Sequence, residues 1–197
     1  MSSIVKGVRR SRTVATVALF TALTVALNLS PVKIPAPYAP FLIYQVWEIP
    51  IVAAFILYGL RAGVAISIFN TLVLLAVFPG VLPTGPLYNL VAVLSMLIGV
   101  YIIQRLVVQS VGKHRDILVV SLSTGLGIMT RVVIMTIVNW AFLRYPPPVG
   151  FSIPVEALVA MLPIIGVFNA TLALYTIPLG HLIAKAVRTG TKGTGRT

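Results

Sequence analysis

Few residues in this chain could carry out catalysis. The acids are Glu48, Asp116 and Glu156, the histidines are His114 and His181, and cysteine is absent, which excludes thiolate catalysis, thiolate metal sites and disulfides. A metalloprotease needs paired His and carboxylate ligands on helix faces, and no such pair occurs. No Ser stands out with a His or Lys partner, and no Gly-Lys-Ser/Thr phosphate loop is present. The sequence therefore argues against an enzyme and against ATP hydrolysis by the chain itself.

A second group of polar residues lies inside long apolar runs. Arg131, Met135, Asn139 and Phe142 follow spacings of 4, 4 and 3, so they share one stripe of a predicted helix. A charge at the bilayer centre costs about 2.5–3.5 kcal/mol, so Arg131 should face the interior of a helix bundle. Its role could be structural, through pairing with helix-end carbonyls, or it could face a ligand.

Two further carboxamides, Asn89 and Asn169, are expected at a depth similar to that of Asn139. Three converging carboxamides would offer hydrogen-bond donors and acceptors to a polar heterocycle. The alternative is hydrogen bonding between helices, which is worth about 0.6 kcal/mol per bond in membranes. Trp47 and Trp140 are ambiguous in the same way, because each could anchor the chain at the membrane interface or stack on a ligand ring.

The composition predicts that these residues are positioned by membrane-spanning helices. The chain is 58% hydrophobic and 9% charged, with a mean hydropathy of +1.04, whereas soluble domains carry about 25% charged residues. A span needs about 20 residues, so 197 residues accommodate one bundle of six helices, which we predict over residues 1–188. Residues 189–197 are rich in Gly and Thr and are predicted to form a disordered basic tail.

The apolar runs define the six predicted spans, which cover residues 13–29, 48–60, 62–78, 87–108, 117–143 and 162–187. A short helix beginning at Pro154 and carrying Glu156 is expected before the last span, after a stiff extended piece at 146–148. The basic start resembles a secretory signal, with cleavage after Ala26 as the alternative, but five further spans favour an uncleaved helix.

Charge placement predicts the topology, because cationic loops are retained in the cytoplasm. Of the fifteen Lys and Arg residues, twelve fall on one side of the predicted membrane, two (Lys33 and Arg144) on the other, and Arg131 lies within a span. We therefore predict a multi-pass protein of the plasma or inner membrane with both ends in the cytoplasm. Attraction to anionic lipid explains the net charge of +12, and no basic face interleaved with aromatics indicates nucleic-acid binding.

The second predicted helix is short. It should begin at Glu48-Ile-Pro50, because Pro suits the first helical turn, and about 12 residues reach only about 18 Å. Part of the preceding segment 41–47 must then lie at membrane depth without being helical, which is tolerated only where protein or a cavity surrounds the backbone. The alternative is a continuous helix over 41–60 with a kink at Pro50.

The first helix carries Ala18 and Ala22 with the small-xxx-small spacing that allows another helix to approach closely. This spacing could serve a partner protein or another helix of the same chain.

Together, these features resemble the substrate-binding S components of energy-coupling-factor (ECF) vitamin transporters, and most closely the riboflavin-type members. Four stretches carry the resemblance: Ala18-Leu-Phe-Thr-Ala22; Ala39-Pro-Phe-Leu42 with Glu48-Ile-Pro50; Gly85-Pro-Leu-Tyr-Asn89; and Met135-Thr-Ile-Val-Asn139 with Phe168-Asn169. The resemblance implies a bundle of six transmembrane helices that binds a vitamin in an outward-facing pocket beneath the loop after the first helix. It also implies docking on a transmembrane coupling subunit that carries two ATPase subunits.

The resemblance assigns Ala18 and Ala22 to partner docking, Glu48, Asn139 and Asn169 to ligand contacts, and the loop 39–44 to gating. With the residues argued above, the predicted substrate site comprises Phe41, Leu42, Tyr44, Trp47, Glu48, Asn89, Arg131, Asn139 and Asn169. No metal or cofactor is expected besides the transported vitamin.

One position departs from the riboflavin pattern. Riboflavin-type members tend to carry Lys three residues after the Asn of the sixth helix, and here that position is Leu172. A lost polar contact can change discrimination by orders of magnitude. Another flavin, a different vitamin or compensation by Arg131 remain alternatives. Rival hypotheses from other classes are a membrane scaffold that transports nothing and a stand-alone carrier, for which no coupling carboxylate lies within the spans.

Overall fold

The structure, a computed structural model, describes residues 2–31, 33–77, 82–107 and 116–193. Within these residues the chain forms six helices and one β-hairpin. The elements in chain order are α1 (Ser2–Leu29), β1 (Ile34–Ala36), β2 (Ala39–Tyr44), α2 (Glu48–Tyr58), α3 (Leu60–Val77), α4 (Gly85–Val107), α5 (Asp116–Phe142) and α6 (Val155–Gly193). The link 109–115 and the turn at Pro79 and Gly80 lie outside the described residues.

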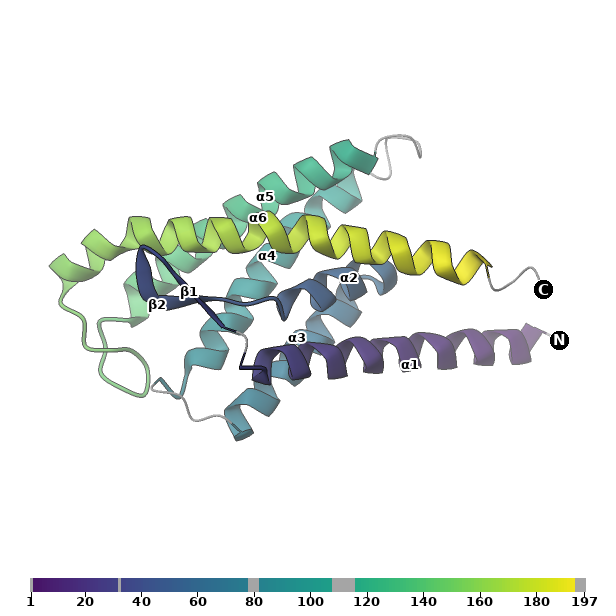
Figure 1. The fold of residues 1–197 in the computed structure, drawn as a ribbon, viewed down its shortest axis with the longest axis horizontal. Helices are drawn as coiled ribbons and strands as arrows, with labels where there is room; N and C mark the ends of the chain where they lie inside the picture. Colours follow the sequence, from purple (N-terminus) through teal and green to yellow (C-terminus); the bar gives the residue numbers. More distant parts are fainter. Residues whose placement is uncertain (1, 32, 78–81, 108–115, 194–197) are drawn as a thin grey trace.

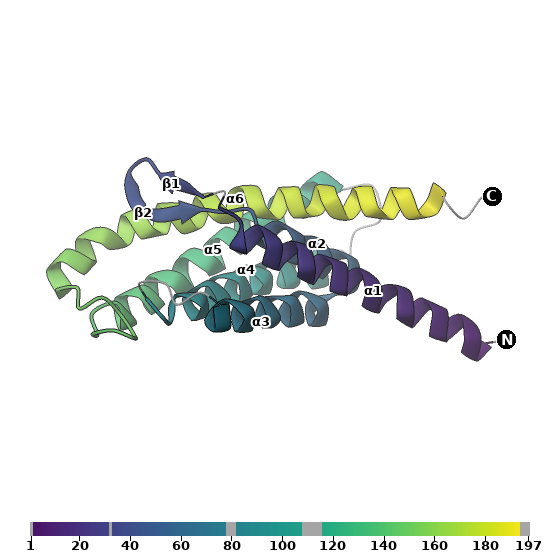
Figure 2. The same cartoon turned by 60° about the horizontal axis from the view of Figure 1, so that its bottom comes forward.

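The helices form an elongated bundle, with the ends of α1 and α6 that carry the chain termini at the same end (Figure 1). Helix α6 packs against α5 and α2, and α4 packs against α5 and α3. The β-hairpin lies along α6, toward the end of the bundle away from the termini, and both views agree on this placement (Figure 2).

Four helices are long and apolar enough to cross a membrane, namely α3, α4, α5 and α6. The apolar part of α1, Thr13–Leu29, and all of α2 are shorter. The described part of the chain is therefore mostly helical, with several helices suited to a bilayer.

Helix α2 has the predicted start and the predicted shortness. It begins at Glu48, spans 11 residues and ends at Tyr58, and the next residue, Gly59, has a φ of 87° in the left-handed region that favours glycine. The Gly59 amide donates to the Phe55 carbonyl over 2.8 Å, which closes the helix. The alternative of an unbroken helix over 41–60 is wrong.

The segment before α2 is more regular than the sequence suggested. Strands β1 and β2 pair antiparallel, with Ile34 opposite Tyr44 and an irregularity between Pro35 and Ala36. Pairing satisfies backbone groups that irregular chain would leave open, and Pro35 is tolerated because it lies in a two-stranded ribbon at an irregular position. The predicted non-helical segment 41–47 thus consists of the end of a β-hairpin followed by a short turn into α2.

Helix α6 corrects two predictions. A short helix from Pro154 and a separate span over 162–187 were expected, but a single helix of 39 residues runs through Pro163 and Pro178. Continuing the helix satisfies the backbone of an apolar segment, and packing against α5 and α2 stabilises it. The helix also continues to Gly193, where a disordered tail was predicted from 189, and the Thr189 hydroxyl bonds back to the Lys185 and Ala186 carbonyls. Residues 194–197 lie outside the described part.

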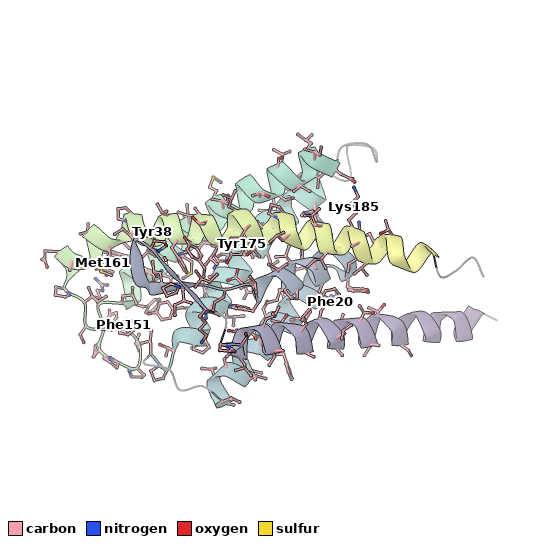
Figure 3. The ribbon with its side chains drawn as sticks, in the orientation of Figure 1. Phe20, Tyr38, Phe151, Met161, Tyr175 and Lys185 are labelled. Atoms are coloured by element: carbon pink, nitrogen blue, oxygen red, sulfur yellow. The ribbon has the colours of Figure 1, made fainter. Side chains whose placement is uncertain are left out.

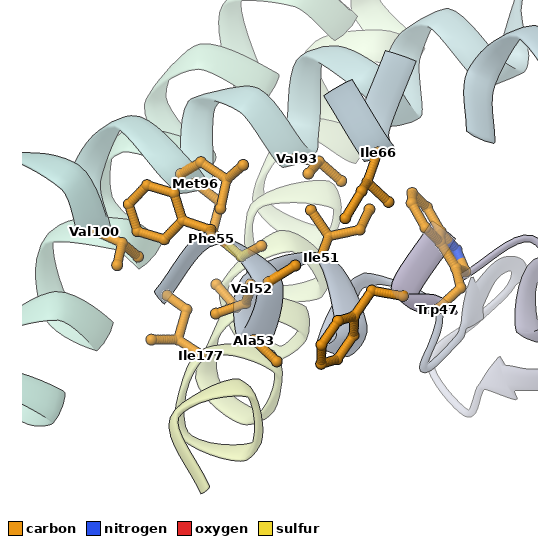
Figure 4. Close-up of a cluster of buried hydrophobic side chains, with 14 residues drawn as sticks. Trp47, Ile51, Val52, Ala53, Phe55, Ile66, Val93, Met96, Val100 and Ile177 are labelled. Carbon is orange, nitrogen blue, oxygen red and sulfur yellow. The ribbon is translucent and has the colours of Figure 1, made fainter. Parts of the chain in front are cut away.

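The core surrounds α2. Ile51, Val52 and Phe55 are fully or almost fully buried, and Figure 4 shows them among Ile66 of α3, Val93, Met96 and Val100 of α4, and Ile177 of α6. A Cβ added at Gly180 of α6 would lie 2.5 Å from Val52 Cγ1, so α6 and α2 are in close contact. This core forms the base on which the site is built.

Candidate functional site: a cavity beneath the hairpin

A cavity of about 500 Å³ opens between the hairpin, the start of α2 and the ends of α4, α5 and α6 away from the termini. Figure 3 shows Phe151 and Met161, two of its lining residues, at that end of the bundle. The described residues that line it are Leu42, Ile43, Gln45, Trp47, Glu48, Leu82, Gly85, Tyr88, Asn89, Ala92, Arg131, Met135, Asn139, Leu143, Phe151, Ile153, Met161, Ile165, Phe168, Asn169 and Leu172.

The cavity wall contains a buried ion pair between Glu48 and Arg131. The guanidinium binds the carboxylate through two nitrogens, with Arg131 Nη2 2.9 Å from Glu48 Oε1 and Nη1 bonded to Oε2. Glu48 lies in the first turn of α2, where the helix dipole favours a negative charge. Both side chains are less than 5% exposed, so each charge depends on the other for compensation.

The ion pair corrects the structural role considered for Arg131. Pairing with helix-end carbonyls was one of the two roles considered, but the partner is a carboxylate 83 residues away in sequence. The guanidinium also lies 3.6 Å from Met96 Sδ and donates from Nε to Asn169 Oδ1 over 3.0 Å. Sequence placed Arg131 in the interior and Glu48 at a helix start, but it carried no signal that the two meet.

The three predicted carboxamides all line the cavity but differ in their hydrogen-bond partners and in their exposure. Asn169 Nδ2 donates to the Ile165 carbonyl over 2.9 Å and its oxygen accepts from Arg131, so it links α6 to α5. Asn139 Nδ2 donates over 2.6 Å to Met135 O of its own helix, so this bond does not join two helices. Asn89 is exposed. Interhelical bonding thus describes Asn169 and does not describe Asn139.

The two tryptophans have different surroundings. Trp47 is 4% exposed and lines both the cavity and the apolar core, so membrane-interface anchoring does not describe it. Trp140 is 43% exposed, and the Arg144 guanidinium lies 4.9 Å from its ring centre. Trp140 is therefore exposed away from the cavity lining, whereas Trp47 forms part of the cavity wall.

The hairpin contributes to the site in two ways. Leu42 lines the cavity, whereas Tyr44 packs on α6, with its ring centre 5.1 Å from that of Phe168 and 6.4 Å from that of Tyr175. Tyr44 is not among the lining residues, so the structure places it as a contact between hairpin and helix. The side chain of Phe41 lies outside the described part of the structure.

Sequence reasoning missed one wall of the cavity. The segment after α5 was expected to be stiff and extended, but it turns back, with the Phe151 amide bonded to Leu143 O over 3.1 Å, and it contributes Phe151 and Ile153. The Tyr88 hydroxyl of α4 holds this segment by donating to Val149 O over 2.8 Å. Gln45 was also missed, although it lies only two residues before Trp47.

The predicted docking residues lie on a separate groove. Ala18 and Ala22 are exposed on α1 and line a groove between α1 and α3 with Ala26, Ala65 and Phe69. This groove shares no lining residue with the cavity.

The fold is known from a solved structure. The chain is similar to a structure described as the S component of a bacterial ECF transporter, with a TM-score of 0.71 and 19% sequence identity over 93% of this chain and 99% of that one. At this identity the likeness concerns the fold. No protein-family model and no curated protein matches the chain.

Proposed function

We propose that the chain is the substrate-capture subunit of an ECF-type importer, which binds riboflavin or a related water-soluble vitamin at the outer face and delivers it inward. The observation that carries the proposal is the cavity beneath the hairpin, lined by Trp47, Glu48 and Asn139, in a fold similar to that of an S component. Volumes of about 300–1,000 Å³ are typical of small-molecule sites, and this cavity lies within that range.

The proposed topology has six crossings, both chain ends in the cytoplasm and the hairpin as an outer gate. Three features support it: four helices are long enough to span, twelve of the fifteen cations fall on one predicted side, and the termini share one end of the bundle (Figure 1). Helix α1 and the short α2 would supply the other two crossings. The cavity, at the opposite end, would then open to the outside.

Riboflavin is the first candidate because Trp47 and Phe168 offer rings to a flat heterocycle and Asn139 offers an amide. Leu172 favours a second candidate, a different vitamin, because it lines the cavity where riboflavin-type proteins tend to carry Lys. Arg131 would not replace that Lys, since its guanidinium is already engaged by Glu48 and Asn169.

Ala18 and Ala22 would dock on a transmembrane coupling subunit that carries two ATPase subunits, because small exposed side chains allow a partner helix to come close. ATP hydrolysis would be done by those partners, and the chain would act as a binding subunit.

The direct test is to purify the protein and titrate it with a panel of vitamins. A yellow preparation or nanomolar riboflavin binding supports the flavin assignment, and binding of another vitamin supports the second candidate. Asn139→Ala should weaken binding at least about tenfold, or 1.4 kcal/mol. Asn28→Ala is the matched control, because Asn28 is a buried amide that bonds to Asn70 away from the cavity. No response to any vitamin would favour the scaffold that transports nothing.

A further inference from the structure

The charges on the cavity wall cancel. Glu48 and Arg131 are the two charged residues among the described lining residues, and they neutralise each other through a two-pronged contact. A charged ligand would lose its hydration on entering and would find no uncompensated opposite charge. The wall is therefore matched to an uncharged molecule.

Most of the hydrogen-bonding groups on the wall are already engaged within the protein. Both ends of the Asn169 amide are bonded, and so is the nitrogen of Asn139. Gln45 is different, because its Oε1 is buried and has no hydrogen-bond partner within the described part of the chain. A buried acceptor without a partner costs about 1–3 kcal/mol, and this cost would be recovered if the Gln45 side chain turned Oε1 toward a ligand N–H in the cavity that the residue lines.

Gln45 is held in place through its backbone. The Tyr175 hydroxyl of α6 donates to the Gln45 carbonyl over 2.6 Å, just after β2 ends and before α2 begins. Tyr175 also packs on Tyr44 of the hairpin. The backbone from which the Gln45 side chain extends is thus held in place, between the end of the hairpin and the start of α2.

We propose that this cavity selects an uncharged ligand whose N–H group lies beside a carbonyl, as in an amide or imide, and that Gln45 is the side chain that recognises this edge. The inference rests on the proposed function. A carboxamide offers a donor and an acceptor side by side, so it pairs with an N–H/C=O edge in two hydrogen bonds. A site built for such a pair rejects analogues that lack the donor, because its own acceptor is then left unpaired.

The test compares ligands that differ by one group. The probes are riboflavin, whose imide N–H lies between two carbonyls, its N3-methyl analogue, riboflavin phosphate, nicotinamide, biotin as a carboxylate, and thiamine as a cation. Affinities are measured by calorimetry on the purified wild type, on Gln45→Leu, and on Gln104→Leu as the matched loss of an amide from α4 away from the cavity. Thermal unfolding of each variant verifies that it is folded.

We expect the wild type and Gln104→Leu to prefer riboflavin over its N3-methyl analogue by at least about tenfold. Gln45→Leu should bind the two flavins equally. The wild type should bind the charged probes, namely riboflavin phosphate, biotin and thiamine, at least about tenfold more weakly than the uncharged probes. If Gln45→Leu fails to fold, the methylated probe on the wild type still tests the requirement for a donor.

Four results would overturn the inference. Preferred binding of biotin or thiamine would refute the uncharged ligand and leave the proposed vitamin-binding function standing. Equal binding of both flavins by the wild type, or full discrimination retained in Gln45→Leu, would refute the role of Gln45. Failure of every probe to bind would overturn the proposed function itself and this inference with it.

Discussion

The two ends of α2 lie in opposite surroundings. Its first residue, Glu48, lines a cavity of about 500 Å³, whereas Ile51, Val52 and Phe55 are at most 1% exposed in a filled core. Met96 of α4 marks the boundary, because it belongs to the core and its sulfur contacts Arg131. The same helices thus enclose a tightly packed core in one half of the bundle and a cavity in the other. The cavity side chains are therefore positioned by elements that the core holds rigidly, as precise binding requires.

The largest expected effect is at the boundary between the two halves. Arg131→Met alone leaves Glu48 buried without a partner and should lower the free energy of unfolding by about 3–5 kcal/mol. Glu48→Leu combined with Arg131→Met removes both charges and should cost much less. Unfolding of Arg131→Met, Glu48→Leu and the double variant in detergent measures the three losses. A double-variant loss equal to the sum of the single losses would mean that the two charges do not depend on each other.

The same Leu→Ala substitution, made once in the core and once at the cavity, distinguishes the packed region from the region that borders the cavity. Leu97→Ala, in the filled core, should cost about 2–5 kcal/mol, because the surroundings cannot close the new space. Leu172→Ala should fall at or below the lower end of that range, since Leu172 already borders the cavity. Chemical unfolding of both variants provides the comparison. Equal losses would contradict the contrast between the two halves.

A smaller effect is expected where α4 meets α5. A Cβ at Gly99 would lie 2.6 Å from the Leu126 carbonyl oxygen, so Gly99→Ala should cost about 1–3 kcal/mol. Gly125→Ala is the control, because nothing lies within 4 Å of a Cβ there, and it should be neutral or stabilising by up to about 1 kcal/mol. Thermal unfolding distinguishes the two. A neutral Gly99→Ala would show that the helices separate easily.

The smallest effect on the folded protein is expected from a substitution in the groove between α1 and α3. Ala22→Leu adds a side chain at an exposed position, so stability and vitamin affinity should stay within about 0.5 kcal/mol of wild type. Uptake into cells or vesicles that contain the partner subunits should nevertheless be lost. Leu19→Ala, an exposed position outside the groove, is the control and should retain uptake. Normal uptake by Ala22→Leu would refute the docking assignment.

The sequence predicted the features that depend on local pattern. Apolar runs located the helices, and the Glu48-Ile-Pro50 start with a short run after it predicted α2. It did not predict that α6 continues through Pro163, because packing overrides the local tendency of proline to end a helix. Interior placement of Arg131 followed from the cost of a charge in lipid, but its partner, 83 residues away, could not be predicted without knowledge of the packing.

The candidate site shows the same division. Residues chosen for polarity within apolar runs, such as Asn139 and Asn169, do line the cavity. Tyr44 was assigned to the ligand from its loop, yet its ring packs on Phe168 and Tyr175 of α6, and no pattern in the sequence indicated that the loop would lie along that helix. The wall from 143 to 153 was missed, since its course depends on turns held by Tyr88 from another helix.

The most direct test of the central claim uses Trp47 as a reporter. In a Trp140→Phe variant, Trp47 is the remaining tryptophan, and it lies on the cavity wall. A vitamin bound beneath the hairpin should change its fluorescence in a saturable way, with riboflavin quenching it at nanomolar concentration. Fluorescence that stays constant while calorimetry records riboflavin binding would place the ligand elsewhere and contradict the account.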